Sequence, residues 1–411
     1  MKLRHTFFLL ALSTAVQARA QLRLPTLPIV PQITDRIRPI TQPLLERRQQ
    51  LLAPLDLRRL GDDLLDRHPK QLSRDPAGQL IVRAELLALP SSAEARGRLL
   101  ALPGVTLIEE TELEGLDLRW LRLRGDTALL AQLRALDPQG QYDYQHIYLG
   151  SGATGPSAPS TNAVSAGTDA SSNLRIGLID SGVALSHPAL RAAHIERWGC
   201  DGPAVDHPAA HGTAVASLLV GADGRFKGAA VGAKLYAADA YCDAPDGGSV
   251  LRMAKALAWL AREKVGVVNI SLVGPANLLL AKAVAAAQSH GLLIAAAVGN
   301  DGPAAPPLYP AAWPGVVAVT GVDPRRRVLA EAGRGPHVMF AAPGSGLWGA
   351  DVDGGYAELR GTSFAAPLVA ALLARESVEG LRATAIDLGA TGRDEVYGWG
   401  LVAEAQRTQK R

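Results

Sequence analysis

Three polar residues stand where strands or helices should begin or end, and together they could transfer an acyl group. The first, Asp180, ends the apolar run LRIGLID and is followed by Ser181-Gly182. In an open α/β sheet, ligands bind at the carboxyl ends of the strands, and a carboxylate there needs a donor because it is partly dehydrated. Taken alone, Asp180 would more simply cap the next turn.

His211 and Ser363 each stand at the start of an Ala/Leu-rich helix. His211 opens HGTAVASLLVG, where the positive end of the helix dipole disfavours an imidazolium and so suits a neutral base. Ser363 follows Gly361-Thr362 in GTSFAAPLVAALLA, so its hydroxyl should face the first backbone N–H groups of that helix. Taken singly, a surface or core histidine and a serine N-cap are the simpler interpretations.

Asn300 completes the set, because it follows the apolar run LLIAAAVG within GNDGP. A carboxamide there could donate an N–H to a developing oxyanion, although an asparagine in a glycine-flanked turn is the plainer alternative. The four groups suit nucleophilic acyl transfer. Ser363 would attack a carbonyl, His211 would move the proton and Asp180 would orient the imidazole.

The elements that would position these residues alternate between apolar strands and Ala/Leu-rich helices. Strands that are apolar on both faces and separated by helices indicate a parallel sheet covered on each side, with right-handed crossovers. We expect strands at Leu174–Ile179, Lys234–Ala240, Val265–Leu272, Leu292–Ala297 and Val316–Val322, and helices at His211–Val220, Val250–Arg262, Leu278–His290 and Ser363–Arg375.

A smaller unit precedes this sheet, over residues 80–150. Its pattern is strand, helix, strand, strand, helix, strand, which is the order of a ferredoxin-like α+β unit. One helix should begin at the capping box Ser91-x-x-Glu94 and the other at Asp126. The strands are expected at Leu80–Leu89, Val105–Glu110, Leu116–Arg124 and Tyr142–Tyr148.

Three further segments have compositions of their own. Residues 1–20 join Lys2 and Arg4 to an apolar stretch and an Ala18-Arg19-Ala20 cleavage pattern, which indicates a secretory signal peptide. A membrane anchor is disfavoured because the stretch is too short to span a bilayer.

Two further segments are irregular in composition. Residues 21–79 form a Pro/Leu/Arg-rich lead with short helical pieces, and residues 151–173 form a Gly/Ser/Ala-rich linker. Residues 174–411 then hold the large sheet.

Charge and cysteine content exclude several classes of protein. The 411 residues include 42 Lys+Arg and 39 Asp+Glu, and the whole excess lies in residues 1–20. This balance argues against nucleic acid as the main partner. Only two cysteines are present, which excludes the usual four-ligand zinc patterns, and no phosphate-binding glycine loop occurs.

Five segments in order resemble the signatures of the subtilisin-like serine peptidases, the subtilases: DSGVALSHPAL, HGTAVAS, VNISLVGP, AAAVGNDGP and GTSFAAP. The resemblance covers Leu174–Gln406 and implies a subtilisin-like α/β fold. It implies a triad of Asp180, His211 and Ser363, with Asn300 as the oxyanion-hole side chain. It also implies that the ferredoxin-like unit is an inhibitory propeptide. The ending YGWGLVAEAQ resembles the family's final segment, so no further C-terminal domain is expected.

The same resemblance places the substrate. SLVGP resembles the strand that pairs with the substrate backbone and lines the side-chain pockets, and Val273 stands where the family usually has glycine. We therefore expect a narrowed pocket. The expected substrate-binding residues are Ser271, Leu272, Val273, Gly274, Ala297 and Gly299.

The resemblance also bears on Cys200, Cys242 and metal ions. If the strands before the two cysteines are neighbours, as in the family, both thiols lie at one end of the sheet and could form a disulfide after export. The loop Gly221–Lys227 keeps only Asp223 as an oxygen ligand, so we expect no tight calcium there. No cofactor is expected, and structural calcium has no clear site.

The sequence therefore predicts a secreted or periplasmic serine endopeptidase made as an autoinhibited zymogen. Its partners would be polypeptide substrates and its own propeptide, with no stable membrane anchor. One alternative is a catalytically silent subtilase-fold binding protein. An α/β-hydrolase esterase would need G-x-S-x-G and the opposite order of serine and acid, and a sedolisin-like peptidase would lack the HGT histidine.

Overall fold

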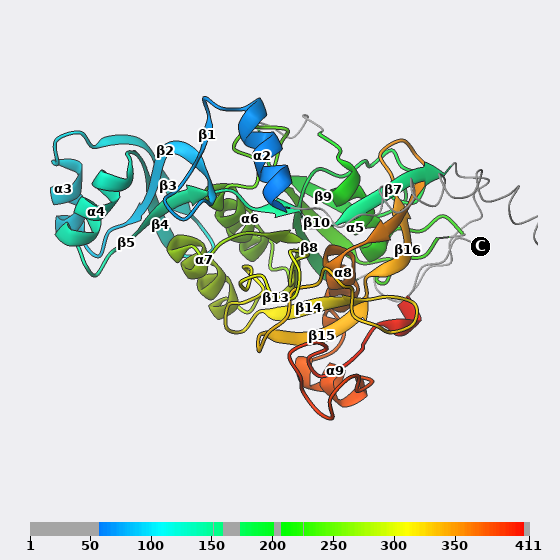
Figure 1. Cartoon of the computed structure of the whole chain (residues 1–411). Coiled ribbons are helices and arrows are strands. Elements are labelled where there is room, and N and C mark those ends of the chain that lie inside the picture. Colours follow the sequence, from blue (N-terminus) through cyan, green and yellow to red (C-terminus); the bar gives the residue numbers. More distant parts are fainter. Residues whose placement is uncertain (1–56, 151, 159–172, 201–206, 225, 407–411) are drawn as a thin grey trace, which may run out of the picture. The chain divides into compact units, whose positions relative to one another are not determined.

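The computed structural model describes residues 57–150, 152–158, 173–200, 207–224 and 226–406, all within one compact unit, Arg48–Arg411. The predicted signal peptide and most of the predicted lead and linker lie outside these residues. Of the helices described, none is long and apolar enough to cross a bilayer. The described chain contains a small module, residues 72–150, and a large module, residues 173–406 (Figure 1).

A seven-stranded parallel sheet forms the centre of the large module. Its strands run in the order β15-β14-β13-β11-β8-β10-β9. Every residue of β11 and β14 is buried, as the apolar runs predict for strands covered on both faces. The predicted α/β fold class is confirmed. The strands are β8 Arg175–Asp180, β9 Ile195–Trp198, β10 Lys234–Asp239, β11 Val267–Ile270, β13 Leu293–Ala297, β14 Val317–Val322 and β15 Val338–Pro343.

Helices cover both faces of this sheet. One buried cluster joins the sheet to α5 and α8, and another joins it to α6 and α7. Asn277 caps α7, because its Oδ1 accepts from the N–H groups of Leu279 and Leu280. The helices are α5 Ala210–Val220, α6 Val250–Arg262, α7 Leu278–Ser289, α8 Thr362–Leu373 and α9 Val378–Thr384, followed by a 3-10 turn at Glu404–Gln406.

The small module has the predicted order of elements and the ferredoxin-like strand order β5-β2-β4-β3, with antiparallel pairing throughout. A short strand, β1 Leu72–Arg74, adds to the beginning of β2. The elements are β2 Leu80–Leu89, α3 Ala93–Leu100, β3 Thr106–Leu113, β4 Leu118–Arg124, α4 Thr127–Leu136 and β5 Gln141–His146.

The start of α3 differs from the prediction by one residue. Ser92 caps this helix by accepting from the Ala95 N–H. Ser91 instead donates its N–H and its hydroxyl to Asp137, which also accepts from the hydroxyl of Tyr142. The predicted capping box at Ser91 is wrong because a buried carboxylate beyond the end of α4 binds that serine.

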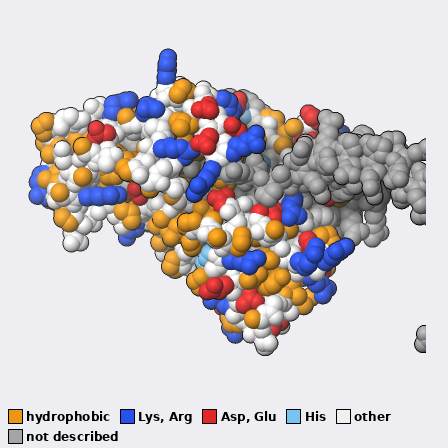
Figure 2. Space-filling view, in the orientation of Figure 1, with side chains coloured by type: hydrophobic (Ala, Val, Ile, Leu, Met, Phe, Trp, Pro, Cys, Tyr) orange, Lys and Arg blue, Asp and Glu red, His pale blue; other side chains and the backbone are white. Residues whose placement is uncertain are grey.

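The two faces of the small sheet have different partners. One face packs on α3 and α4 in a core of its own. The other face contributes Leu87, Leu113, Leu116 and Trp120 to the cluster that contains α6 and α7. The small sheet therefore sits on two helices of the large module. On the face that Figure 2 shows, basic, acidic and apolar side chains are interspersed.

The linker, which was predicted to be irregular, contains regular structure. Within the predicted linker, β7 Ala153–Ala158 pairs with β17 Tyr356–Arg360, which also pairs with β16 Ser345–Ala350. Within the predicted lead lies α2 Leu57–Arg67, which agrees with the short helical pieces expected there. A Gly/Ser-rich composition did not reveal β7, because its partner lies two hundred residues further along the chain.

Candidate active site

Asp180 and His211 meet at the carboxyl end of β8, an interior strand of the seven-stranded sheet. His211 Nδ1 lies 2.8 Å from Asp180 Oδ1, which also accepts from the N–H and the hydroxyl of Ser181. The Asp180 side chain is buried, so this contact fixes the orientation of the imidazole and keeps the proton on Nδ1. Nε2 is then the basic atom, and it is buried without a hydrogen-bond partner among the described residues.

Glycine at position 212 allows α5 to approach β8 this closely. A Cβ on Gly212 would lie 2.1 Å from the main-chain oxygen of Ser181. The Gly212 N–H donates to the Ser181 hydroxyl, and the Thr213 hydroxyl accepts from the Ala184 N–H. The segment HGT therefore fixes the distance between the helix and the strand, and with it the histidine–carboxylate contact.

Ser363 is buried in the first turn of α8. Its hydroxyl donates to the Ser271 carbonyl at 3.1 Å, and the Ser271 hydroxyl donates to the Ser363 carbonyl at 2.9 Å. Asn269 supports this pair by donating to the Ser271 hydroxyl. The next residue, Phe364, lies against His211 with 5.3 Å between ring centroids. Ser271, expected to bind substrate, thus uses its side chain to hold Ser363.

Asn300 lies next to the same turn of α8. Its carboxamide oxygen accepts from the Thr362 N–H at 3.1 Å, and the Thr362 hydroxyl accepts from the Gly299 N–H. Because the oxygen is engaged, the NH₂ group is the end of the side chain that can donate to an oxyanion. The structure therefore brings all four predicted chemical residues to one edge of the sheet.

A segment of the chain itself lies along the predicted substrate-binding strand. β6 Leu149–Gly150 pairs antiparallel with β12 Leu272–Val273. A Cβ on Gly150 would lie 3.7 Å from the His211 ring, and one on Gly152 would lie 3.1 Å from Nε2. The main chain at Gly150 and at Gly152 therefore lies close to the imidazole.

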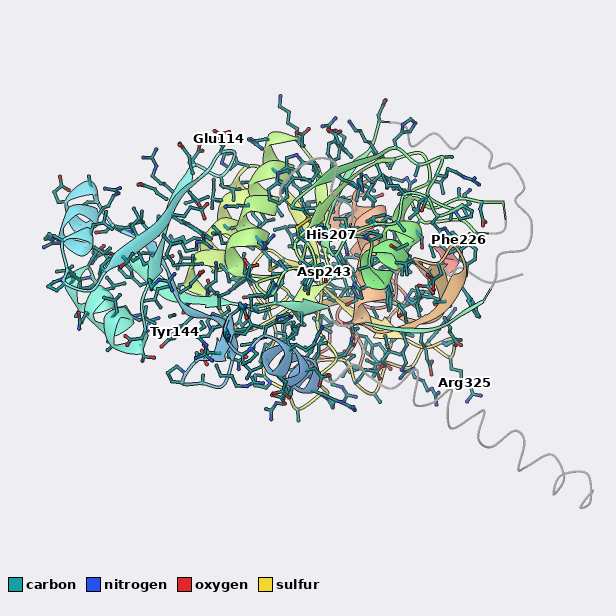
Figure 3. All side chains as sticks on the ribbon, turned by 90° about the horizontal axis from the view of Figure 1, so that it is seen from above. Glu114, Tyr144, His207, Phe226, Asp243 and Arg325 are labelled. Carbon is teal, nitrogen blue, oxygen red and sulfur yellow. A yellow bond between two sulfur atoms is a disulfide. The ribbon has the colours of Figure 1, made fainter. Side chains whose placement is uncertain are left out.

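A cavity of about 540 Å³ adjoins this segment. His207 and Asp243, near the centre of Figure 3, lie on its wall, and Leu60 and Leu64 of α2 line it as well. These leucines also belong to the apolar cluster of Leu149. α2 is thus part of the cleft, a position that the sequence analysis did not predict for the lead. The leucines at positions 57, 60 and 64 were the available signal, because their spacing is that of a helix face.

The remaining predicted substrate-binding residues surround β12. Ala297 ends β13, and Gly299 follows it with a φ of 95°. A Cβ on Gly299 would lie 2.5 Å from the side chain of Leu308, which packs in the same cluster as Val273. The side chain of Leu308 therefore occupies the space beside Gly299, and Val273 packs in the same cluster as Leu308.

Cys200 and Cys242 form the predicted disulfide, with Cα atoms 5.2 Å apart, beyond the ends of the neighbouring strands β9 and β10. Asp239 lies beside it and accepts from the N–H groups of Tyr241 and Cys242. Burial raises the pKa of Asp239. The disulfide thus joins two loops next to the cleft.

Asp223, the one oxygen ligand expected in the loop Gly221–Lys227, is engaged by the chain. Its carboxylate accepts from the Phe226 N–H and from the hydroxyl of Tyr356. These two hydrogen bonds occupy lone pairs of the Asp223 carboxylate that a calcium ion would otherwise use. The absence of tight calcium at this loop stays a prediction.

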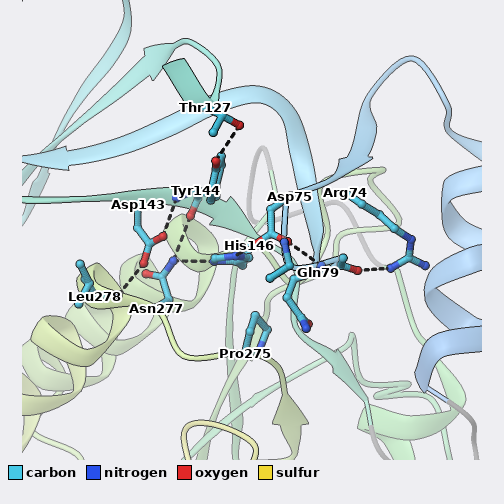
Figure 4. A network of polar contacts seen from close by, with 12 residues as sticks. Arg74, Asp75, Gln79, Thr127, Asp143, Tyr144, His146, Pro275, Asn277 and Leu278 are labelled. Carbon is cyan, nitrogen blue, oxygen red and sulfur yellow. Dashed lines mark hydrogen bonds and ion pairs between the residues drawn. The ribbon is translucent and has the colours of Figure 1, made fainter. Parts of the chain in front are cut away.

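Buried polar contacts join the small module to α7 (Figure 4). Asn277 Nδ2 donates to the Tyr144 carbonyl and lies 2.9 Å from His146 Nδ1. The other ring nitrogen of His146 lies 3.2 Å from Asp75 Oδ2. Burial acts to raise the pKa of Asp75, but its hydrogen bonds, first that from His146, outweigh burial and lower it. Contacts on both sides of β5 therefore hold it in place.

Comparisons with known proteins agree with this geometry. Residues 171–400, more than half of the chain, match the subtilase family of peptidases. Minor extracellular protease Epr of Bacillus subtilis (strain 168) is 32% identical over 57% of this chain and 39% of its own length. Subtilisin Savinase of Lederbergia lenta is 31% identical over 57% of this chain and 90% of its own length. The chain therefore spans well under two thirds of Epr and most of Savinase.

Solved structures share the fold. Fervidolysin from Fervidobacterium pennivorans, a keratinolytic enzyme related to subtilisin, superposes with a TM-score of 0.64 at 18% identity, over 80% of this chain and 61% of its own. The prenylagaramide maturation protease PagA superposes with a TM-score of 0.50 at 25% identity, over 58% of this chain and 93% of its own. The family match and the similarity to Subtilisin Savinase show that the chain belongs to the subtilase family of serine endopeptidases.

Proposed function

We propose that this chain is a secreted serine endopeptidase, made as an autoinhibited zymogen, which hydrolyses peptide bonds through Asp180, His211 and Ser363. Its family supports the class of reaction. The roles of these residues are supported by the 2.8 Å contact between Asp180 Oδ1 and His211 Nδ1. This contact leaves His211 Nε2 as a buried basic nitrogen beside the first turn of α8. A base held in this way is suited to take the proton of a serine hydroxyl.

Each group then has a defined step. Ser363 Oγ attacks the peptide carbonyl while His211 Nε2 takes its proton, and Asp180 stabilises the imidazolium. The Ser363 N–H and Asn300 Nδ2 donate to the oxyanion of the tetrahedral intermediate. When the intermediate collapses, His211 gives the proton to the leaving amine and an acyl-enzyme remains. A water molecule, activated by His211, then hydrolyses the ester.

The small module acts as an intramolecular inhibitor in this proposal. Its last strand, β6, takes the place beside β12 where a substrate backbone would pair. Packing of its sheet on α6 and α7 holds that strand in place. The closeness of Gly152 to His211 Nε2 supports a self-cut within residues 150–152.

Export is proposed from residues 1–20, with their basic start, apolar stretch and small-residue cleavage pattern. A disulfide between Cys200 and Cys242 supports an oxidising compartment. Outside the cell or in a periplasm, the substrates would be polypeptides.

Replacing the nucleophile tests the proposal. The wild-type precursor should yield a new amino terminus at residue 151 or 152, and a fluorophosphonate should label Ser363 in the product. Ser363→Ala should remain uncut. Ser289→Ala is a matched control, because its hydroxyl bonds only locally to the Ala286 carbonyl on α7, and it should be processed normally.

Two results would contradict the proposal. Normal processing of Ser363→Ala would show that another peptidase makes the cut. A correctly folded wild-type protein that does not cut itself, and that no fluorophosphonate labels after the small module has been removed, would instead indicate a catalytically silent binding protein.

A further inference from the structure

The helix α2, which precedes the small module in the chain, packs against the strand that occupies the cleft. Leu57 is buried and Leu60 and Leu64 are half-buried on one face of this helix. These leucines pack in the cluster that also contains Leu149 of β6 and Val273 of β12. The strand β6 is therefore held by two elements, through main-chain pairing with β12 and through apolar packing with α2.

The same face of α2 lies opposite the catalytic residues. Leu60 and Leu64 line the cavity of about 540 Å³ from one side, and Asp180 and His211 line it from the large module. Gly152, next to the expected cut, lines it as well. A polypeptide that entered this part of the cleft would therefore meet α2.

The helix is bound to the small module through a tight connection to β1. The His68 N–H donates to the Leu64 carbonyl at 2.9 Å, and the Leu72 N–H donates to the His68 carbonyl at 2.9 Å. From β1, the guanidinium of Arg74 binds the carboxylate of Asp62 on α2. α2 and the small module should therefore enter and leave the cleft together.

We propose that α2 is a second inhibitory element, which keeps the cut end of the small module in the cleft after the self-cut. The inference rests on the proposed zymogen function and goes beyond it, because it assigns the duration of inhibition to a helix outside the small module. The strand β6 has only two residues, Leu149 and Gly150, so its main-chain pairing alone is short. Apolar packing of Leu149 with α2 adds to that pairing and should slow dissociation.

The bond to be cut is positioned by other contacts. β6 pairs with β12, and a Cβ on Gly152 would lie 3.1 Å from His211 Nε2 and 2.6 Å from the ring of Phe364. None of these groups belongs to α2. Changes on the helix should therefore shorten the time for which the nicked precursor stays inactive, and leave the rate of the cut nearly unchanged.

Two double variants of the full-length precursor test the proposal. Leu60→Ala with Leu64→Ala removes apolar contact while keeping a good helix former at both positions. Asp63→Ala with Asp66→Ala is the matched control, because both side chains lie on the exposed face of the same helix. Gel electrophoresis follows the cut, and casein degradation reports the release of active enzyme.

The leucine variant should be cut at a rate within about 2-fold of the wild type. Its delay between the cut and casein degradation should be about 5-fold shorter or more, because a fragment that is held less tightly leaves faster. The aspartate variant should keep the wild-type delay.

A second measurement needs no turnover. In the Ser363→Ala precursor, deuterium exchange is read on a peptide that covers Leu149 and Gly150, with β14 as the reference strand. The leucine variant should exchange about 5-fold faster or more at Leu149 and Gly150, and at the parent's rate in β14. Equal exchange at Leu149 and Gly150 in the variant and the parent would contradict the contribution of α2.

The outcomes separate this inference from the function on which it rests. A leucine variant that is cut normally and degrades casein after an unchanged delay would overturn the role of α2 alone. A leucine variant that is cut many times more slowly would also overturn it, because α2 would then position the bond. A wild-type precursor that neither cuts itself nor degrades casein would overturn the zymogen function as well.

Discussion

Ser271 and Ser363 hold each other through two hydrogen bonds that run in opposite directions, each hydroxyl donating to the other residue's carbonyl. Ser271→Ala removes the bond that anchors the main chain of the nucleophile. We expect the rate at which a fluorophosphonate labels Ser363 to fall about 2- to 10-fold, the effect of about 0.5–1.5 kcal/mol. Ser289→Ala should leave that rate unchanged, and an unchanged rate in Ser271→Ala would contradict the positioning role.

Asn300→Ala should reduce turnover without weakening substrate binding. The oxyanion exists only in the transition state and the tetrahedral intermediate, so kcat falls while KM stays nearly constant. Removing one oxyanion donor from a subtilisin lowers kcat by a factor of about 10²–10³, and we expect a loss of the same order for Asn300→Ala. The exposed Asn173→Ala is the control. A loss confined to KM would show that Asn300 binds the ground state.

Val273→Gly should widen the pocket beside the cut bond. Val273 is buried on β12 and packs in one cluster with Leu308, so its removal opens space beside β12. Cleavage of peptides with a large residue before the cut bond should rise about 10-fold relative to those with a small one. A peptide-library profile identical to that of the wild type would place this pocket elsewhere.

The disulfide should stabilise the large module mainly through the unfolded chain. Its cysteines are 42 residues apart, so replacing both with serine should lower the free energy of unfolding by about 2–4 kcal/mol. Urea unfolding of the Ser363→Ala precursor avoids self-digestion, and a reductant should reproduce the loss. Two free thiols in the denatured, exported protein would rule the bond out.

Asp137 should make the small module sensitive to acid. Burial acts to raise its pKa, but hydrogen bonds from Ser91 and Tyr142 outweigh burial and lower it from 3.8 to about 2. The pKa of Asp137 is lower in the folded protein than in the unfolded chain. The ionised carboxylate therefore stabilises the fold above about pH 4, and this stabilisation is lost as the pH falls towards about 2.

The corresponding variant is Asp137→Asn in the Ser363→Ala precursor. It should melt at a lower temperature at pH 7, and the gap to the parent should close by pH 2. A gap that stays constant with pH would show that the carboxylate's charge does not matter.

The parts of the molecule that could be predicted from the sequence are those with local signals. Apolar runs that end in Asp180 or Asn300 mark strands and their functional ends, and Gly361 marks the turn before α8. Pairing between distant segments leaves no such mark. β7 and the fit of Tyr148 against Gly274 depend on residues more than a hundred positions away. Ser91 is a further example within the small module. Its sequence context favoured a helix cap, but Asp137, which lies far from it in the sequence, binds its hydroxyl.

The pairing of β7 with β17 has a consequence for the proposed self-cut. A cut within residues 150–152 would release an amine that remains tethered, because Ala153 stays opposite Arg360 in the sheet. A tethered amine has a high effective concentration at the acyl-enzyme and can rejoin the chain as readily as water can hydrolyse the ester. Maturation would then become irreversible only when β7 separates from β17 or the small module dissociates. The rate of that opening, and not the chemistry, would set the lifetime of the nicked precursor.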